Sequence, residues 1–261
     1  MQQKLLFLIP VYRHNPLIII DEIRKTFPHS EIIVVDDGEG IMIKDTRHIE
    51  ILKHKTNMGL AKSLIDGYER ALQKTADYVI KIDADLEYPL YPVKNIIDIL
   101  NKAQKTSGAY VELKRSIFSN GIIDGLFHII FGAIEGSLLI NKRMFQHSPG
   151  LHIYKKETLI QILPRVKKIH QSINVKWGLD LVFLHLANHE GKLVAHTISK
   201  HEWVERRSKI KILNQILSTS GLLFILKYYS IINSIKTNGV YEVNLSELAF
   251  DEDIIEKDTI L

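Results

Sequence analysis

The chain of 261 residues is 46% hydrophobic and 25% charged, so it can bury the core of one large domain without a structural metal. It contains no cysteine, which excludes thiol nucleophiles, thiolate metal sites and disulfides and suits a reducing compartment. The net charge is +4, but residues 241–261 hold seven acids and one lysine, a net of −6, so residues 1–240 carry about +10.

A basic body of this kind suits anionic partners, namely nucleotide phosphates, lipid phosphates or a membrane surface. An ordinary solvated basic surface accounts for the charge equally well. No recognised motif or basic-aromatic ladder points to nucleic acid, so we expect no nucleic-acid partner. The apolar run at 4–9 is too short for the core of a signal peptide, and we therefore expect a cytoplasmic protein.

Strand and helix patterns alternate along the first half of the chain. Apolar runs predict strands at 4–9, 31–35, 49–52 and 78–82, and further patterns predict helices at about 16–26 and 59–74. This alternation predicts an α/β fold, with a Rossmann-like, mostly parallel sheet flanked by helices. Ligands bind beyond the carboxyl ends of the strands in such sheets, and the motifs described below follow those ends.

The second half has a looser pattern. It predicts a strand near 109–113, a loop at 141–150, a strand at 151–154, a helix at 156–163 ended by Pro164, and a helix at about 178–189. Residues 122–140 are long enough to cross a membrane. Because this stretch contains Asp124, His128 and Glu135, we expect a buried or cleft-lining helix instead.

A long, partly amphipathic helix is predicted at 210–234, ahead of the acidic tail. Its apolar patch and flanking lysines suit a membrane interface, which would place the protein at the inner face of the membrane beside a lipid-linked acceptor. Packing on the domain, or across a homodimer, accounts for the same pattern equally well.

Two carboxylates flank one residue in Asp83-Ala84-Asp85, directly after a predicted strand. Hard oxygen ligands suit Mg2+ or Mn2+, either of which can hold a diphosphate through its oxygens. A turn or helix cap made of aspartates is the alternative.

A second pair, Asp36-Asp37, follows the strand at 31–35 and precedes Gly38, which allows a sharp turn. Carboxylates at such a position accept hydrogen bonds from ribose hydroxyls or from a base in other nucleotide sites. A plain turn is again the alternative. The two acid pairs together favour a nucleotide-diphosphate site at the ends of the strands.

The order of four motifs resembles glycosyltransferase family 2. These motifs are PVY at 10–12, VVDDG at 34–38, NMGLAKSLIDGY at 57–68 and DADLEYP at 83–89. More narrowly, the chain resembles the dolichyl-phosphate mannosyltransferase and polyprenyl-phosphate sugar transferase group. The resemblance is tight over 4–115 and looser over 148–210, and it implies a GT-A fold that binds a UDP- or GDP-linked sugar.

The resemblance implies roles for residues of the donor half. The nucleoside would be held by Pro10, Tyr12 and either Asp36 or Asp37. Asp83 would lie near the ribose or the metal. The metal would be bound mainly by Asp85, with Glu87 as an added carboxylate where relatives often have glutamine. Arg115 matches an arginine near the diphosphate, although an ordinary exposed arginine fits it as well.

The resemblance also implies roles beyond residue 148. Asp180, in WGLD at 177–180, matches the catalytic acid of relatives that glycosylate hydroxyls, where it would serve as the base. Its alternative is an aspartate that stabilises the start of a helix. The basic loop at 201–209 would face the diphosphate with Arg206, Arg207 and Lys209. His201 is a further candidate metal ligand or a surface histidine.

These observations predict a GT-A catalytic domain at 1–209, with a donor half at 1–115 and an acceptor half at 116–209, followed by an extension at 210–261. We expect an inverting, metal-dependent glycosyltransferase that moves a sugar from a nucleotide diphosphate to a hydroxyl of a glycan or of a lipid-linked acceptor. Two alternatives stay open: transfer to a polyprenyl phosphate, and a non-catalytic protein that binds nucleotide sugars.

Overall fold

A computed structural model describes residues 3–38, 40, 48–114, 122–140, 142–199 and 240–243. Eight strands form one sheet in the order β3-β2-β1-β4-β6-β5-β7-β8. The strands are β1 (Leu5–Val11), β2 (Glu31–Asp36), β3 (Ile49–Lys53), β4 (Tyr78–Ile82), β5 (Thr106–Leu113), β6 (Leu151–Lys155), β7 (Lys192–Ile198) and β8 (Val240–Val243).

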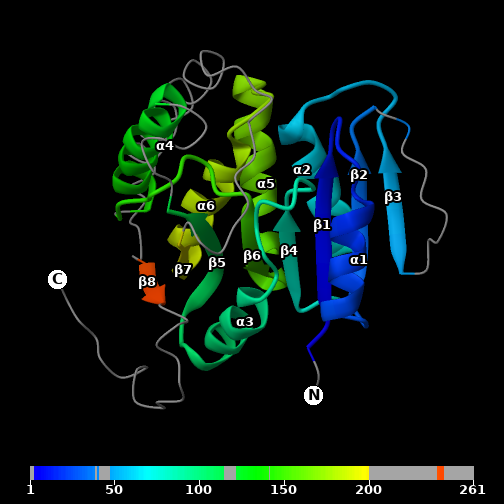
Figure 1. The fold of residues 1–261 in the computed structure, drawn as a ribbon, viewed down its shortest axis with the longest axis horizontal. Coiled ribbons are helices and arrows are strands. Elements are labelled where there is room, and N and C mark those ends of the chain that lie inside the picture. The colour runs from blue at the N-terminus through cyan, green and yellow to red at the C-terminus, as the bar shows by residue number, and fades with distance from the viewer. Residues whose placement is uncertain are drawn as a thin grey trace.

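The sheet is mostly parallel, as predicted. Strands β1 to β4 pair in parallel with one another, and β5, β7 and β8 do the same. Strand β6 lies between these two groups and runs antiparallel to both β4 and β5. The carboxyl ends of the parallel strands therefore lie at the same edge as the amino end of β6 (Figure 1).

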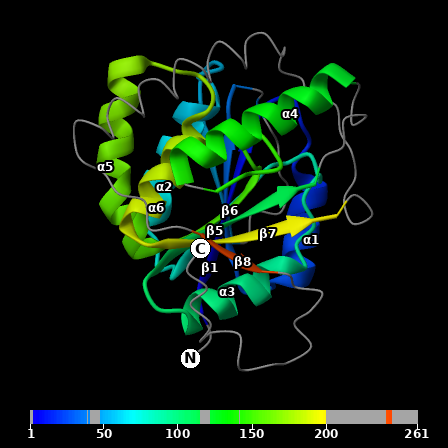
Figure 2. The ribbon, with the colours of Figure 1, turned by 90° about the vertical axis from the view of Figure 1, so that its left-hand side faces the viewer.

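Helices cover both faces of the sheet. The apolar residues of α1 (Leu17–Thr26) and α3 (Pro92–Lys102) pack on one face, and those of α2 (Leu60–Leu72), α5 (Lys156–Ile173) and α6 (Leu179–Glu190) pack on the other. Figure 2 shows α5 and α6 on one side of the sheet and α1 on the opposite side. The alternation of side chains along each strand sends neighbouring residues to these two separate cores.

Residues 122–140 form α4 (Ile122–Glu135), which continues into a π-helical segment, η1 (Gly136–Ile140). The expectation of a buried helix is met on one side only, since Phe127 and Glu135 are buried whereas Ile130 and Ile134 are exposed. None of the described helices combines the length and apolar character that crossing a bilayer requires.

The helix predicted to end at Pro164 continues to Ile173, so that boundary is wrong. Pro164 has no N–H to donate to the preceding turn, but it lies on an exposed part of the helix, where water can reach the carbonyl left without that donor. Leu159, Ile162 and Val166 continue the buried stripe across it. Burial of this stripe therefore outweighs the cost of an internal proline.

Helix α3 and strands β7 and β8 were not predicted. The helix predicted at 210–234 lies outside the described residues, as does most of the proposed 210–261 extension.

Candidate donor and acceptor site

The acids singled out in the sequence gather at one edge of the sheet. Asp37 follows β2, Asp83 follows β4, and Asp180 lies in the first turn of α6. The arrows of β1, β2 and β4 in Figure 1 all end at this edge. The structure thus brings the predicted donor acids and the predicted base to the same side of the fold.

Strained backbone marks the same edge. Arg13 after β1, Leu86 after β4 and Ser148 before β6 have φ values of 57°, 63° and 46°. Left-handed conformations cost a residue with a side chain about 1–3 kcal/mol, and such residues cluster at functional sites. Three of the six such residues in the described ranges lie at this edge, and His48 and Lys105 lie at the opposite one, so the acids rather than the strain locate the candidate site.

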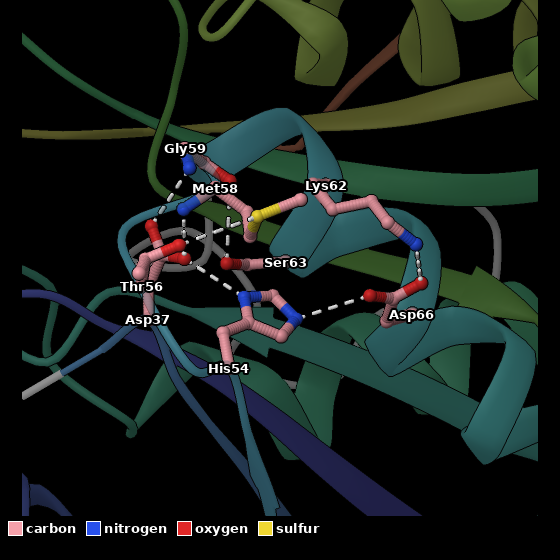
Figure 3. Close-up of polar contacts among 8 residues, drawn as sticks. All are labelled: Asp37, His54, Thr56, Met58, Gly59, Lys62, Ser63 and Asp66. Carbon is pink, nitrogen blue, oxygen red and sulfur yellow. Dashed lines mark hydrogen bonds and ion pairs between the residues drawn. The ribbon is translucent and has the colours of Figure 1, made fainter. Parts of the chain in front are cut away.

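Both carboxylate oxygens of Asp37 are bound within the protein. Its Oδ1 accepts hydrogen bonds from the backbone N–H of Met58 (2.7 Å) and from Nδ1 of His54 (2.8 Å). Its Oδ2 accepts one from the backbone N–H of Gly59 (2.9 Å). Figure 3 shows the carboxylate between the His54 ring and the start of α2. The side chain is only 4% exposed, and it holds the segment that leads into α2, whose N-cap is Gly59.

The N–H groups that Asp37 binds come just before α2. In many nucleotide sites the first N–H groups of a helix bind the phosphates. Those of α2 begin at Leu60, and the N–H of Ala61 already donates to the carbonyl of Lys176 (3.0 Å). Asp36 precedes Asp37 at the end of β2, is 1% exposed, and accepts a hydrogen bond from the backbone N–H of His54 through its carbonyl oxygen.

A buried lysine connects the other acids. Nζ of Lys81 lies 2.8 Å from Oδ1 of Asp83 and 3.6 Å from Oδ2 of Asp180, and its side chain is 1% exposed. Lys81 and Asp83 lie two positions apart at the end of β4, so both reach the same face of the sheet. One cation therefore joins a predicted donor acid to the predicted base.

The charges in this cluster shift one another's pKa values. Burial raises the pKa of Asp83 to about 6, although Lys81 opposes the increase and 36% of the side chain remains in contact with solvent. Burial would also raise the pKa of Asp180, but the Lys81 ammonium outweighs it and holds that pKa below the usual range. Burial lowers the pKa of His152, opposite Lys81 on β6, to about 3, so this ring is neutral.

The loop at 142–150 closes over the acids. The backbone N–H of Gly150 donates to the Tyr88 hydroxyl (2.7 Å), and this hydroxyl donates to Oε1 of Gln146 (2.8 Å). A Cβ atom on Gly150 would lie 2.3 Å from Oδ2 of Asp83, closer than any side chain can approach. A larger residue at 150 would therefore displace the Asp83 carboxylate or the Tyr88 ring.

The same loop reaches Asp180. The Ser148 hydroxyl donates to Oδ2 of Asp180 (3.2 Å), and the backbone N–H of Ser148 donates to Oε2 of Glu135 (3.4 Å). Glu135 also contacts Nδ1 of His147 at 2.5 Å and is fully buried. The end of α4 therefore holds the loop that contacts the predicted base.

The remaining predicted residues fall into two groups. Pro10 belongs to β1, Tyr12 follows it with 41% of its surface exposed, Asp85 accepts a hydrogen bond from the Glu87 backbone (3.1 Å), and Glu87 is buried. The rest lie outside the described residues: Arg115, His201, Arg206, Arg207 and Lys209.

Two residues of the site were not predicted. Lys81 is a single charge in an apolar strand, YVIKI, two positions before Asp83, and this spacing could have revealed it. His54 had no comparable signal, because its partners Asp37 and Asp66 lie 17 and 12 positions away in the sequence.

No group of three or more histidine, aspartate or glutamate side chains among the described residues is arranged as a complete metal cage. Mg2+ typically uses one or two carboxylates together with phosphate oxygens of the substrate. Asp83 and Asp85 follow β4 and would be the carboxylates of such a shared site, with Oδ1 of Asp83 already paired to Lys81.

The comparison with known families is decisive for the fold and the chemistry. The profile described as glycosyl transferase family 2 matches residues 8–163, which is more than half of the chain. The chain belongs to glycosyltransferase family 2. It is thus a glycosyltransferase that uses a nucleotide sugar, and the matched range contains Asp37, Lys81 and Asp83 but not Asp180.

Two solved structures resemble this glycosyltransferase. Mannosyl-3-phosphoglycerate synthase from Rubrobacter xylanophilus is 14% identical with a TM-score of 0.53, over 89% of this chain and 75% of that one. A mannosyltransferase from Pyrobaculum calidifontis, solved in complex with GDP-Man and Mn2+, is 15% identical with a TM-score of 0.52, over 91% of this chain and 66% of that one. Identity at this level shows the fold alone, and that fold is the predicted GT-A fold. A search of curated proteins finds no match to the chain.

Proposed function

We propose that this family 2 glycosyltransferase transfers a sugar from a nucleotide diphosphate to an acceptor hydroxyl with inversion at the anomeric carbon. The observation that carries the proposal is the Lys81 bridge, which joins Asp83 of the donor half to Asp180 of the acceptor half. In an inverting displacement the attacking hydroxyl and the leaving diphosphate lie on opposite faces of one anomeric carbon, so the residues assigned to each have to lie close together, and this cluster joins them.

The donor would lie across the ends of β1, β2 and β4, with Asp36, Pro10 and Tyr12 close to the nucleoside. Asp85 and Asp83 would hold Mg2+ or Mn2+ together with the diphosphate, and Glu87 is a further carboxylate in the same turn. When bound, the cation neutralises the negative charge that builds up on the leaving group. Since a GDP-Man complex is known for a protein of similar fold, GDP-mannose is the first donor to test, followed by UDP-linked sugars.

Asp180 would act as the base. Lys81 holds its pKa low, so the carboxylate is ionised at neutral pH and able to accept a proton. Oδ2 faces Lys81 and Ser148, whereas Oδ1 is buried without a hydrogen-bond partner among the described residues, so Oδ1 is the oxygen left to take the proton once the acceptor hydroxyl reaches it. A single displacement assisted by one base inverts the anomeric carbon.

A second acceptor class is favoured by a specific observation. Asp180 is only 3% exposed and ion-paired, which also fits a purely structural role. A polyprenyl phosphate is already ionised and needs no base, so the lipid-phosphate alternative requires nothing of Asp180. Three further points remain predictions. They are the membrane interface or homodimer contact at 210–234, the roles of the loop residues Arg206, Arg207, Lys209 and His201, and a cytoplasmic location.

An Asp180→Asn variant separates the two acceptors. For a hydroxyl acceptor, we expect the transfer rate to fall by about a hundredfold or more with unchanged affinity for the nucleotide, because general-base catalysis contributes about 10²–10⁴-fold. Full activity on a polyprenyl phosphate would support the alternative. The exposed Asp98→Asn variant on α3 is the matched control and should retain wild-type rates.

The metal is tested separately with Asp85→Ala. We expect this variant to lose manganese-dependent binding of UDP or GDP in isothermal titration while its melting temperature stays near that of wild type. Unchanged binding would remove Asp85 from the metal site.

A further inference from the structure

The contacts of His54 extend beyond Asp37. Its Nδ1 lies 2.8 Å from Oδ1 of Asp37, and its Nε2 lies 3.0 Å from Oδ2 of Asp66 on α2. Lys62, one turn before Asp66 on α2, makes an ion pair with the other oxygen of Asp66. Figure 3 shows the imidazole ring between the two carboxylates, with Lys62 beyond Asp66.

Both contacts require a hydrogen on the histidine. An ionised carboxylate only accepts hydrogen bonds, so a ring that donates to both acids carries a hydrogen on each nitrogen. Acidic and basic side chains then alternate in the series Asp37–His54–Asp66–Lys62. Among the described residues, the ring forms its ion pairs with Asp37 from the end of β2 and with Asp66 from α2.

These linked side chains hold the turn that contains the proposed nucleotide acids, Asp36 and Asp37. The backbone N–H of Asp37 donates to the carbonyl of Val11 (3.0 Å), next to Tyr12. Gly38 has φ of 92°, and a Cβ atom there would lie 2.7 Å from the carbonyl carbon of Thr56, so the turn after β2 rests directly on the segment before α2. His54 bonds the two segments together at this point of close approach.

We infer that His54 is a positioning residue for donor binding, which acts through Asp37 as a cation shared with Asp66. It would act without touching the substrate. The inference rests on the proposed donor site at the ends of β1 and β2. Loss of the imidazolium would leave Asp37 without one of its three donors, and the turn that carries Asp36 would no longer be held in one position.

The test compares four variants by the dissociation constant for GDP and UDP with Mn2+, and by kcat and donor KM. For His54→Asn we expect the dissociation constant and KM to rise about tenfold, because the asparagine amide is neutral and too short to join Asp37 to Asp66, so any hydrogen bond to Asp37 that it keeps has no charge behind it. We expect kcat at saturating donor to stay within about twofold, since no catalytic group has been removed. Asp66→Asn keeps the Asp37 contact and should raise the constant by about threefold or less.

Arginine can donate to two carboxylates at once, so His54→Arg should restore affinity to within about threefold of wild type. The control is His29→Asn, an exposed histidine before β2 at the opposite end of that strand, and it should match wild type. A merely structural role would lower the melting temperature of His54→Asn and leave the affinity of the folded protein unchanged, and that result would overturn the inference.

A His54→Arg variant that binds the nucleotide as weakly as His54→Asn would also overturn the inference, because the shared positive charge would then have no effect on affinity. If wild type bound neither nucleotide, the proposed donor site would fail, and this inference with it. Wild-type binding with equal affinity in His54→Asn would remove the inference alone.

Discussion

Replacement of Lys81 by methionine tests the cluster at the centre of the site. Methionine has a similar length and no charge, so Lys81→Met leaves Asp83 and Asp180 facing each other without their shared cation. Removing one partner of a buried ion pair costs about 3–5 kcal/mol, since the other charge remains buried. Asp180, at 3% exposure, carries this cost, whereas Asp83, at 36% exposure, is relieved by water.

We therefore expect a loss near the lower limit, about 3 kcal/mol. At about 2–4 °C for each kcal/mol in chains of 150–250 residues, the melting temperature should fall by about 10 °C. The matched control is Lys167→Met, whose ion pair with Glu69 is 2.5 Å long but about 40% exposed on both sides (41% and 40%). Such surface pairs contribute about 1 kcal/mol or less, so this variant should remain close to wild type.

The decisive assay adds a second substitution. Lys81→Met/Asp180→Asn removes the stranded carboxylate and should recover much of the lost stability. Without Lys81, burial raises the pKa of Asp180, and a folded-state pKa above the unfolded value favours folding as the pH falls through it. The deficit of the single variant should therefore shrink between pH 7 and pH 5. Wild-type stability of Lys81→Met, or a double variant less stable than the single, would refute the reasoning.

Three further outcomes are expected. Gly150→Ala should lower kcat/KM for the donor by about tenfold or more, because its Cβ would lie 2.3 Å from Oδ2 of Asp83 and 2.5 Å from Cε2 of Tyr88. The pKa of Asp83 is raised to about 6, so this carboxylate is protonated as the pH drops through 6, and donor turnover should fall. Its contribution to the free energy of unfolding should rise over the same range, because the folded-state pKa lies above the unfolded value. Rates and melting temperatures measured against pH check the two effects. Pro164→Ala should stabilise the protein by about 2 kcal/mol in urea denaturation, since an internal proline costs about 3 kcal/mol and restricts the unfolded chain by up to about 1 kcal/mol.

Local patterns were sufficient for most of the donor half of the fold, with α3 the exception. Strand β4 was predicted at its observed bounds, because a short apolar run that stops at two acids is typical of a buried strand followed by a turn. The end of α5 was predicted wrongly, because the cost of Pro164 is local whereas the burial of Val166 and Ile169 depends on α2 and α6. Strand β8 is contributed from more than 40 positions after β7, and no local pattern predicts such a pairing.

The candidate site could be located from the sequence, but its contacts could not. Acids after β2 and β4 meet at one edge because parallel strands end together, and that follows from the strand pattern alone. The inward direction of Asp37 and the contact of Lys81 with Asp180 do not follow from it. Lys81 and Asp180 are 99 positions apart (180 − 81), and β6 and α6 must be in place before the distance between them is defined.

Strand β6 also sets the order in which the protein can assemble. Strands β1 to β4 lie within the first 82 residues and pair with one another, so this half can form early during synthesis. Strand β5 has no such partner, because its place beside β4 is occupied by β6, which emerges some 40 residues later. The edge of β4 therefore stays unpaired until β6 has been synthesised. Pairing of β6 with β4 places His152 opposite Lys81 and joins the two halves of the sheet. We expect late folding events, and the segments most prone to mispairing, to concentrate at this joint.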